Sequence, residues 1–291
     1  MNASTIPLSE VEALRAWIGR EQHADDIVDA DLVRKFSATF DGPEAIPGPG
    51  DVAPRLIHFC LAQPAAPTAE LAADGHPQRG GFLPPVPLPR RMWAGGRLTF
   101  RGDLRIGDTV RRTSRIADVT VKEGRSGVLC FVVVDHVIAV DGQVMIEERQ
   151  DIVYRDGGSG GGGAAGASRK PAPAALGVHR HTVEPSSPLL FRYSALTFNA
   201  HRIHYDRRYA TEVEAYPGLV VHGPLQATLL MNFAAGLRGV PPARFAFRSV
   251  SPLFDDAPVC LHACDEGNGL KLWTARPDGP EAMVADAGWA D

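Results

Sequence analysis

Two adjoining segments carry the clearest structural pattern: RLTFRGDLRIGDTVRRTSRIADVTVKEG, residues 97–124, and GVLCFVVVDHVIAVDGQVMIEERQDIVYR, residues 127–155. In both segments β-branched residues recur with a period of two, and turn-forming pairs such as Gly107-Asp108 and Asp141-Gly142 interrupt them. This alternation predicts successive antiparallel strands joined by turns. The first half of the chain is therefore expected to end in an antiparallel sheet.

Helical patterns precede this sheet. The segment Ser9–Arg20 has apolar residues at helical spacing, which predicts an amphipathic helix. A second helical pattern covers Val52–Ala62, where Leu56, Phe59 and Cys60 share one side. Its apolar character indicates a buried helix.

The second half of the chain repeats the order of helix and then sheet. The segment Gly223–Leu237 is continuously apolar, which predicts a buried helix because no polar face remains for solvent. Strand patterns lie at His179–Glu184, Ala243–Val250, Val259–Cys264 and Leu270–Arg276, separated by Asp, Gly and Pro. The simplest architecture is one helix wrapped by an antiparallel sheet, formed twice.

Glycine dominates the segment between the two halves. Residues 157–168 have the sequence GGSGGGGAAGAS, which offers almost no side chains whose burial could offset the entropy of ordering. This composition predicts a linker. The expected organisation is an N-terminal domain at residues 1–156, a glycine-rich linker at 157–170 and a C-terminal domain at 171–291.

Composition and charge limit the classes of partner. With 291 residues, of which 44% are hydrophobic and 22% charged, the chain can bury a full core. A formal net charge of -4 provides no basic field, so nucleic acid is not expected as a partner. The apolar run Val128–Val140 is interrupted by Asp135 and His136, and the N-terminus lacks the apolar core of a secretory signal. No membrane span is predicted, and a cytoplasmic location is expected.

The four cysteines do not indicate a disulfide framework in a chain of this length. Cys260 and Cys264 lack a second ligand pair at the spacing that zinc sites use. All four are expected to be small buried hydrophobic residues.

Chemistry is concentrated in the stretch FNAHRIHYDRRYATEVEAYPGLVVHGP, residues 198–224. It places several proton-handling side chains directly before the apolar helix that starts near Gly223. A histidine titrates near neutral pH and can take and return a proton. A backbone N–H at a helix N-terminus, assisted by the helix dipole, can stabilise a developing negative charge. Together these groups indicate an active site.

The same residues resemble a known family. The segment SALTFNAHRIHYDRRYATEVEAYPGLVVHGPL, residues 194–225, resembles the hydratase motif of the MaoC-like (R)-specific enoyl-CoA hydratases, and is most similar to the type 2 hydroxyacyl-thioester dehydratase branch. PPVPLPRRMWAGGRLTF, residues 84–100, resembles the opening of the first hotdog in long bacterial members of that branch, which include mesaconyl-C4-CoA and itaconyl-CoA hydratases.

The resemblance implies a fold and an activity. The fold would be an α+β double hotdog with two long central helices, each wrapped by an antiparallel sheet. The C-terminal hotdog would carry the chemistry, and a degenerate N-terminal hotdog would complete the acyl tunnel and the coenzyme A site. The activity would be reversible hydration of a short enoyl-CoA, such as mesaconyl-C4-CoA or itaconyl-CoA, to a hydroxyacyl-CoA. No metal or other cofactor is implied, since coenzyme A enters as part of the substrate.

The resemblance also assigns catalytic roles. The family motif is Asp-x-Asn-Pro-x-His, and its six positions here run from Asn199 to His204, so the His matches and the Asp is replaced by Asn199. His204 is the expected base, and the Gly223 N–H is expected to face the thioester oxygen. An amide cannot be a general base, so Asn199 is expected to orient water. Asp206 is an alternative source of a base.

Further residues are candidates for contact with substrate. His201 and Arg202 could bind a substrate carboxylate, while His201 could instead only cap a loop. Histidine 222 is expected to bond backbone near the helix start, and Tyr193 and Ser194 could line the channel or belong to an ordinary strand. The basic pair before the first long strand could bind coenzyme A phosphates, with the following tryptophan stacked on adenine, or form a solvated turn. The full set is His201, Arg202, Tyr193, Ser194, His222, Arg90, Arg91 and Trp93.

Other functions stay open on the same scaffold. A 3-hydroxyacyl-ACP dehydratase of fatty-acid synthesis, a hotdog acyl-CoA thioesterase and a non-catalytic acyl-CoA binding module are the alternatives, because a fold does not determine a reaction. Hotdog units generally pair, so a homodimer of double hotdogs is a further expectation.

Overall fold

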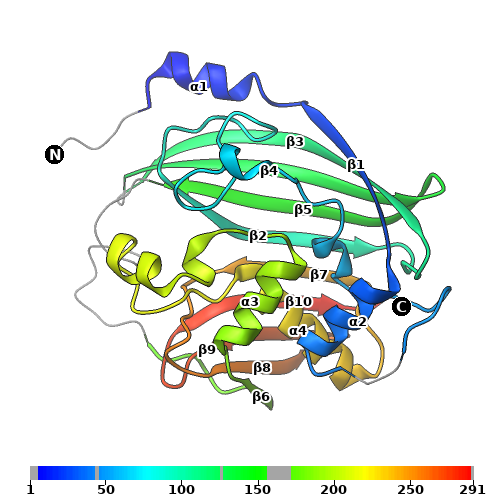
Figure 1. Ribbon diagram of the computed structural model, residues 1–291. Helices are drawn as coiled ribbons and strands as arrows, with labels where there is room; N and C mark the ends of the chain where they lie inside the picture. The colour runs from blue at the N-terminus through cyan, green and yellow to red at the C-terminus, as the bar shows by residue number, and fades with distance from the viewer. Residues whose placement is uncertain (1–5, 43–45, 125–126, 156–171, 290–291) are drawn as a thin grey trace.

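The computed structural model describes residues 6–42, 46–124, 127–155 and 172–289. The ten strands within these residues form one antiparallel sheet in the order β1-β3-β4-β5-β2-β7-β10-β9-β8-β6 (Figure 1). Each half of the chain contributes five neighbouring strands, and in each half the order is first, third, fourth, fifth, second. The two halves therefore share one topology. The predicted linker at 157–170 lies outside the described residues.

The strands alternate with short turns, as the period of two indicates. The N-terminal half supplies β1 (Glu21–Ile27), β2 (Arg90–Phe100), β3 (Thr109–Gly124), β4 (Gly127–Val140) and β5 (Gln143–Arg155). The C-terminal half supplies β6 (His179–Val183), β7 (Arg244–Ser249), β8 (Val259–Glu266), β9 (Gly269–Ala275) and β10 (Glu281–Gly288). The pattern predicted neither β1 nor β10, and β2 begins at Arg90, before the predicted segment that starts at residue 97.

The halves join where β2 pairs with β7. Gly95–Thr99 of β2 lie opposite Arg244–Arg248 of β7. Only glycine fits at position 96, since a Cβ atom there would lie 2.7 Å from Cζ of Phe247 and 2.8 Å from the carbonyl oxygen of Arg149. The close approach makes the sheet continuous from one half to the other.

Helices cover mainly the C-terminal half of the sheet. The helical elements of the described residues are α1 (Leu8–Arg15), α2 (Ala30–Thr39), η1 (Ile57–Cys60), η2 (Thr68–Glu70), α3 (Ser187–Leu196), η3 (Arg202–His204), η4 (Tyr209–Val213) and α4 (Gly223–Arg238). In Figure 1, α2, α3 and α4 lie over the strands β7 to β10. The 16-residue α4, predicted from its apolar sequence, has a proline in its first turn and is capped after Arg238 by Gly239, whose φ is 73°.

The helix expected at Val52–Ala62 does not form. Only η1 is helical there, as a short 3-10 turn, and it follows Leu56, whose φ of 66° is left-handed. Val52 instead forms a bridge with Arg105, the N–H of Ala53 donates to the carbonyl oxygen of Leu104, and the left-handed Leu56 breaks the helical path. The prediction of two long central helices is therefore wrong for the N-terminal half, in whose described residues no counterpart of α4 occurs.

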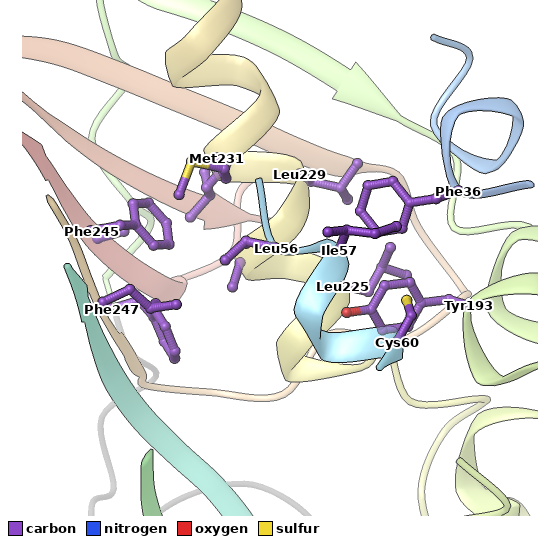
Figure 2. Close-up of a cluster of buried hydrophobic side chains, with 14 of the residues drawn as sticks. Phe36, Leu56, Ile57, Cys60, Tyr193, Leu225, Leu229, Met231, Phe245 and Phe247 are labelled. Atoms are coloured by element: carbon purple, nitrogen blue, oxygen red, sulfur yellow. The ribbon is translucent and has the colours of Figure 1, made fainter. Parts of the chain in front are cut away.

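The main hydrophobic core surrounds α4 and reaches into both halves. Figure 2 shows Leu225 of α4 near Tyr193 and Ile57, while Phe245 and Phe247 of β7 lie on the other side of the helix. These side chains are buried or nearly so. Complete burial of one such side chain stabilises a fold by about 1.5–3 kcal/mol. The core thus fixes the start of α4 against the junction of the halves.

Smaller predictions had mixed outcomes. The N-terminal helix ends at Arg15 instead of Arg20. Cys60 and Cys130 are buried as expected, whereas Cys260 and Cys264 are partly exposed. Among the described residues, every helix is too short or too polar to span a membrane.

Candidate active site

A cavity of about 970 Å³ is lined by both halves of the molecule. The N-terminal half contributes inward-facing residues of β3, β4 and β5 and the irregular segment before β2. The C-terminal half contributes α3, residues 199–205 and the start of α4. No long helix covers the inner face of β3 to β5 within the described part of the chain, and this leaves space for a ligand next to the motif.

His204 is held in one tautomer by the backbone. It ends η3 and is only 7% exposed. Its Nδ1–H donates a hydrogen bond to the carbonyl oxygen of Val220 over 2.7 Å, so Nε2 keeps a lone pair that can accept a proton. Burial lowers the pKa of His204 to about 4, and the hydrogen bond to Val220 opposes this shift only in part. The imidazole is therefore neutral at neutral pH, the form that a general base needs.

His222 connects His204 to the start of α4. The two rings stack with centroids 3.7 Å apart and planes 16° apart. His222 is the N-cap residue of α4, and its Nε2 lies 2.8 Å from Oγ of Ser194. Gly223 follows and lines the cavity, and its N–H meets no hydrogen-bond acceptor among the described residues. An imidazole and a helix-terminal amide thus border one cavity, and His222 links them because it stacks on His204 and directly precedes Gly223.

The neutral state of His204 predicts an unusual pH profile. A base with an unshifted histidine pKa of about 6.5 would be about 97% protonated, and inactive, at pH 5. Because the pKa of His204 is about 4, kcat/KM is expected to stay nearly level from pH 8 to pH 5 and to fall only as pH approaches 4. Initial rates across this range, with circular dichroism at each pH to verify folding, provide the measurement. A fall centred near pH 6.5 in the folded enzyme would contradict the assignment.

The other motif residues form a tight turn on the cavity wall. Oδ1 of Asn199 accepts the backbone N–H of His201 over 3.0 Å, so its carbonyl oxygen closes the turn. The ring of His201 lies 5.4 Å from that of His204 and 4.1 Å from that of His76. Burial, followed by the charges of the neighbouring histidines, lowers the pKa of His201. At neutral pH it offers hydrogen bonds and no positive charge.

Arg202 and Asp206 are engaged with each other and are not among the described residues that line the cavity. Nε and Nη2 of Arg202 donate to Oδ2 of Asp206 over 3.1 and 2.7 Å. Asp206 also accepts the N–H of Tyr209, and this bond and the contact with Arg202 lower its pKa. These positions do not support Arg202 as the ligand of a substrate carboxylate or Asp206 as the base.

Tyr193 and Ser194 lie on α3, not on a strand, and both line the cavity. The hydroxyl of Tyr193 is 3.4 Å from Oγ1 of Thr228, and its ring packs edge-on against His222 with centroids 5.2 Å apart. Burial raises the pKa of Tyr193 well above its usual value, so the phenol stays protonated. The two side chains hold His222 from one side.

Arg90, Arg91 and Trp93 all lie on β2 and line the cavity. The guanidinium of Arg90 is 3.7 Å from a carboxylate oxygen of Glu214. The Trp93 ring packs on Phe247, with centroids 4.5 Å apart. It also lies against Gly223, where an added Cβ atom would be 3.0 Å from Cε3 of Trp93. Trp93 therefore forms part of the cavity wall beside the start of α4.

Two sets of polar residues on the cavity wall were not predicted from the sequence. One is the loop that carries Asp74 and His76, which lies in the irregular segment before β2. The other is a row of polar side chains on neighbouring strands, which occupy inward positions where the alternation predicts apolar residues. This row contains Ser114, His136 and Glu148, with Arg112 and His58 beside it.

A metal ion was not expected, but one cluster has suitable ligand types. Asp74, His76 and His201 each place one ligand atom within 4.8 Å of the others, and all three line the cavity. The carboxylate of Asp74 accepts a hydrogen bond from His76 over 3.0 Å. Burial would raise the pKa of Asp74, but the hydrogen bonds from the ring and backbone of His76 and the charges of His76 and His201 together outweigh it, so the pKa lies below its usual value.

Known structures with the same architecture define the class of fold. HtdX of Mycobacterium tuberculosis has 18% sequence identity and a TM-score of 0.63, with 93% of this chain and 100% of that chain covered. A second Mycobacterium tuberculosis protein, described as having a double hotdog fold, has 12% identity and a TM-score of 0.54, with 95% and 96% covered. The fold is a double hotdog of the α+β class, as predicted.

Sequence comparison then places the chain within a family. Residues 56–255 match the family hydroxyacyl-thioester dehydratase type 2. The chain is 48% identical over 271 residues to the mesaconyl-C4-CoA hydratase of Chloroflexus aurantiacus, with 93% of this chain and 95% of that protein covered. The chain belongs to the hydroxyacyl-thioester dehydratase type 2 family, and it is an enzyme of the hydratase and dehydratase type.

Proposed function

We propose that the enzyme hydrates the carbon–carbon double bond of mesaconyl-C4-CoA, or of a closely similar short dicarboxylic enoyl-CoA, and catalyses the reverse dehydration. The observation that carries the proposal is that His204, stacked on His222, and Gly223, the residue after His222, line the same cavity. The relative named mesaconyl-C4-CoA hydratase, which is 48% identical in an alignment that covers 93% of this chain, supports the choice of substrate.

The chemistry follows from these two groups. Nε2 of His204 takes a proton from water while the water oxygen bonds to the β-carbon of the enoyl thioester. The electrons of the double bond move to the thioester oxygen, and the resulting enolate accepts a hydrogen bond from the Gly223 N–H at the positive end of α4. The enolate then collapses as the α-carbon takes the proton from His204. Water is added and the base returns to its neutral state.

Polar residues at the N-terminal side of the cavity favour a polar acyl group. Ser114, His136 and Glu148 lie side by side on β3, β4 and β5, and Nε2 of His58 is 3.4 Å from a carboxylate oxygen of Glu148. Nε of Arg112 is buried without a hydrogen-bond partner among the described residues. An alkyl tail here would leave these buried polar groups without water, whereas a carboxylate or hydroxyl oxygen would supply an acceptor for Arg112.

The thioester carrier is the less specified part of the substrate. Arg90 and Arg91 belong to the cavity wall that the N-terminal half provides, and guanidinium groups bind phosphate through a fork of donors. This position supports coenzyme A as the carrier, with Arg91 as the stronger candidate because Arg90 is already close to Glu214.

A substrate panel tests the proposal. The rate constant kcat/KM for mesaconyl-C4-CoA is expected to exceed that for crotonyl-CoA by about 100-fold or more, because crotonyl-CoA lacks the free carboxylate. Loss of enoyl-thioester absorbance, with mass spectrometry of the hydroxyacyl product, measures both. Stoichiometric release of coenzyme A would instead identify a thioesterase, and saturable binding without turnover a binding module. Turnover of acyl-carrier-protein thioesters alone would identify a fatty-acid dehydratase.

A further inference from the structure

The loop around Gly75 is docked onto the hydratase motif from the N-terminal half. The carbonyl oxygen of Asp74 accepts the N–H of Arg202 over 2.9 Å, and Nη1 of Arg202 donates to the carbonyl oxygen of Ala73 over 3.1 Å. Gly75 has φ +92°, and a Cβ atom on it would lie 1.9 Å from the carbonyl oxygen of Ala200. The loop therefore holds a fixed position against the motif.

Within this loop Asp74 orients His76. One carboxylate oxygen of Asp74 accepts the backbone N–H of His76 and the other accepts its ring Nδ1–H, each over 3.0 Å. Since Nδ1 carries the proton, Nε2 of His76 has a free lone pair. The His76 ring contacts His201, whose ring in turn contacts that of His204, and all three rings line the cavity. The cavity thus contains a second oriented imidazole near the base.

We propose that His76, oriented by Asp74, holds the attacking water and so replaces the carboxylate that the motif lacks at Asn199. This inference rests on the proposed hydration reaction. The amide oxygen of Asn199 accepts the backbone N–H of His201 in a turn, and an amide, unlike a carboxylate, cannot take a proton from water. Nε2 of His76 accepts a hydrogen bond from the attacking water. His76 is then a catalytic residue in contact with the reacting water, and Asp74 is a positioning residue.

The proposed step conserves protons and electrons. One O–H bond of the water breaks and its proton goes to Nε2 of His204, while the oxygen forms the new bond to the β-carbon. The second O–H bond stays intact, points at Nε2 of His76 throughout and becomes the hydroxyl of the product. The proton held by His204 then moves to the α-carbon. His76 therefore matters for water attack and does not matter for proton exchange at the α-carbon.

This difference gives a test with two assays. The first is hydration of mesaconyl-C4-CoA, and the second is exchange of the α-hydrogens of its saturated analogue methylsuccinyl-C4-CoA in heavy water, which needs no attacking water. His76→Ala is expected to lower kcat for hydration about 100-fold while α-exchange stays within about threefold of wild type. Asp74→Asn is expected to lower hydration about 10-fold, again with α-exchange retained. The exposed His181→Ala on β6 serves as the matched control and should change neither rate.

Other outcomes would overturn the inference. Equal losses in both assays would assign the loop a structural role, and unchanged hydration in His76→Ala would make the residue dispensable. A stoichiometric metal ion in the purified enzyme, with activity lost to a chelator and restored by that metal, would replace the imidazole role by a metal site at Asp74, His76 and His201. If the wild-type enzyme hydrates no enoyl thioester, the proposed function fails as well, so the wild-type assay separates the two failures.

Discussion

Replacement of His204 by alanine is expected to lower kcat for hydration about 1,000-fold, with KM changed by no more than about threefold. The buried imidazole is the only described group on the cavity wall that combines a fixed neutral tautomer with a position stacked against the residue before Gly223. Its loss removes the acceptor for the proton of water and the donor for the α-carbon. The measurement is single-turnover hydration together with titration of a non-reactive saturated thioester, which reports binding separately.

The same variant should also lose α-hydrogen exchange, because the proton of the α-carbon passes through the same imidazole. An unchanged melting temperature would show that the loss is chemical and not structural. The exposed His181→Ala again provides the control for removal of an imidazole. Hydration by His204→Ala at a rate within about tenfold of wild type would refute the assigned base.

Gly75→Ala is expected to lower the free energy of unfolding by about 2–4 kcal/mol and hydration activity by at least about 100-fold. The new Cβ atom would lie 1.9 Å from the carbonyl oxygen of Ala200, and the backbone at φ +92° is strained for any residue with a side chain. The loop must then move away from the motif, and it takes Asp74 and His76 with it. Thermal melts and steady-state kinetics measure the two effects.

Gly19→Ala is the matched control for this substitution. Gly19 also has a positive φ, +89°, but a Cβ atom there would meet nothing within 4 Å. Its cost should be limited to backbone strain of about 1–2 kcal/mol, without an effect on kcat. Comparable losses of activity in both variants would show that strain alone, and not displacement of the loop, explains the result.

The sequence predicted the C-terminal half better than the N-terminal half. The apolar run that became α4 has no polar face and no interruption, so its spacing alone indicates a buried helix. The segment 52–62 shows the same apolar spacing, yet the left-handed Leu56 interrupts it and only the short η1 forms. Apolar spacing does not reveal that a residue has a left-handed backbone conformation, and this is why the second central helix was wrongly expected.

The site was predictable where its residues are close in sequence. Asn199, His204 and Gly223 lie within one stretch of sequence, so the family resemblance is enough to predict that they share a site. His76 comes from a loop more than one hundred positions earlier, and its place beside His201 depends on the docking of Gly75 against Ala200. Glu148 is likewise brought to the cavity only by the register of three strands. Contacts of this range have no local signature.

The continuous sheet has a consequence for self-association, since it ends in two open edges, β1 and β6. An exposed edge strand invites pairing with another chain, and charged side chains discourage it. The β1 edge carries Glu21, Asp25 and Asp26, and the short β6 edge carries Arg180. A twofold-symmetric dimer would place like edges together, and edge pairing would bury these charged side chains, whose loss of water is unfavourable. A symmetric pair of these molecules should therefore meet through broad faces and not extend into a twenty-stranded ribbon.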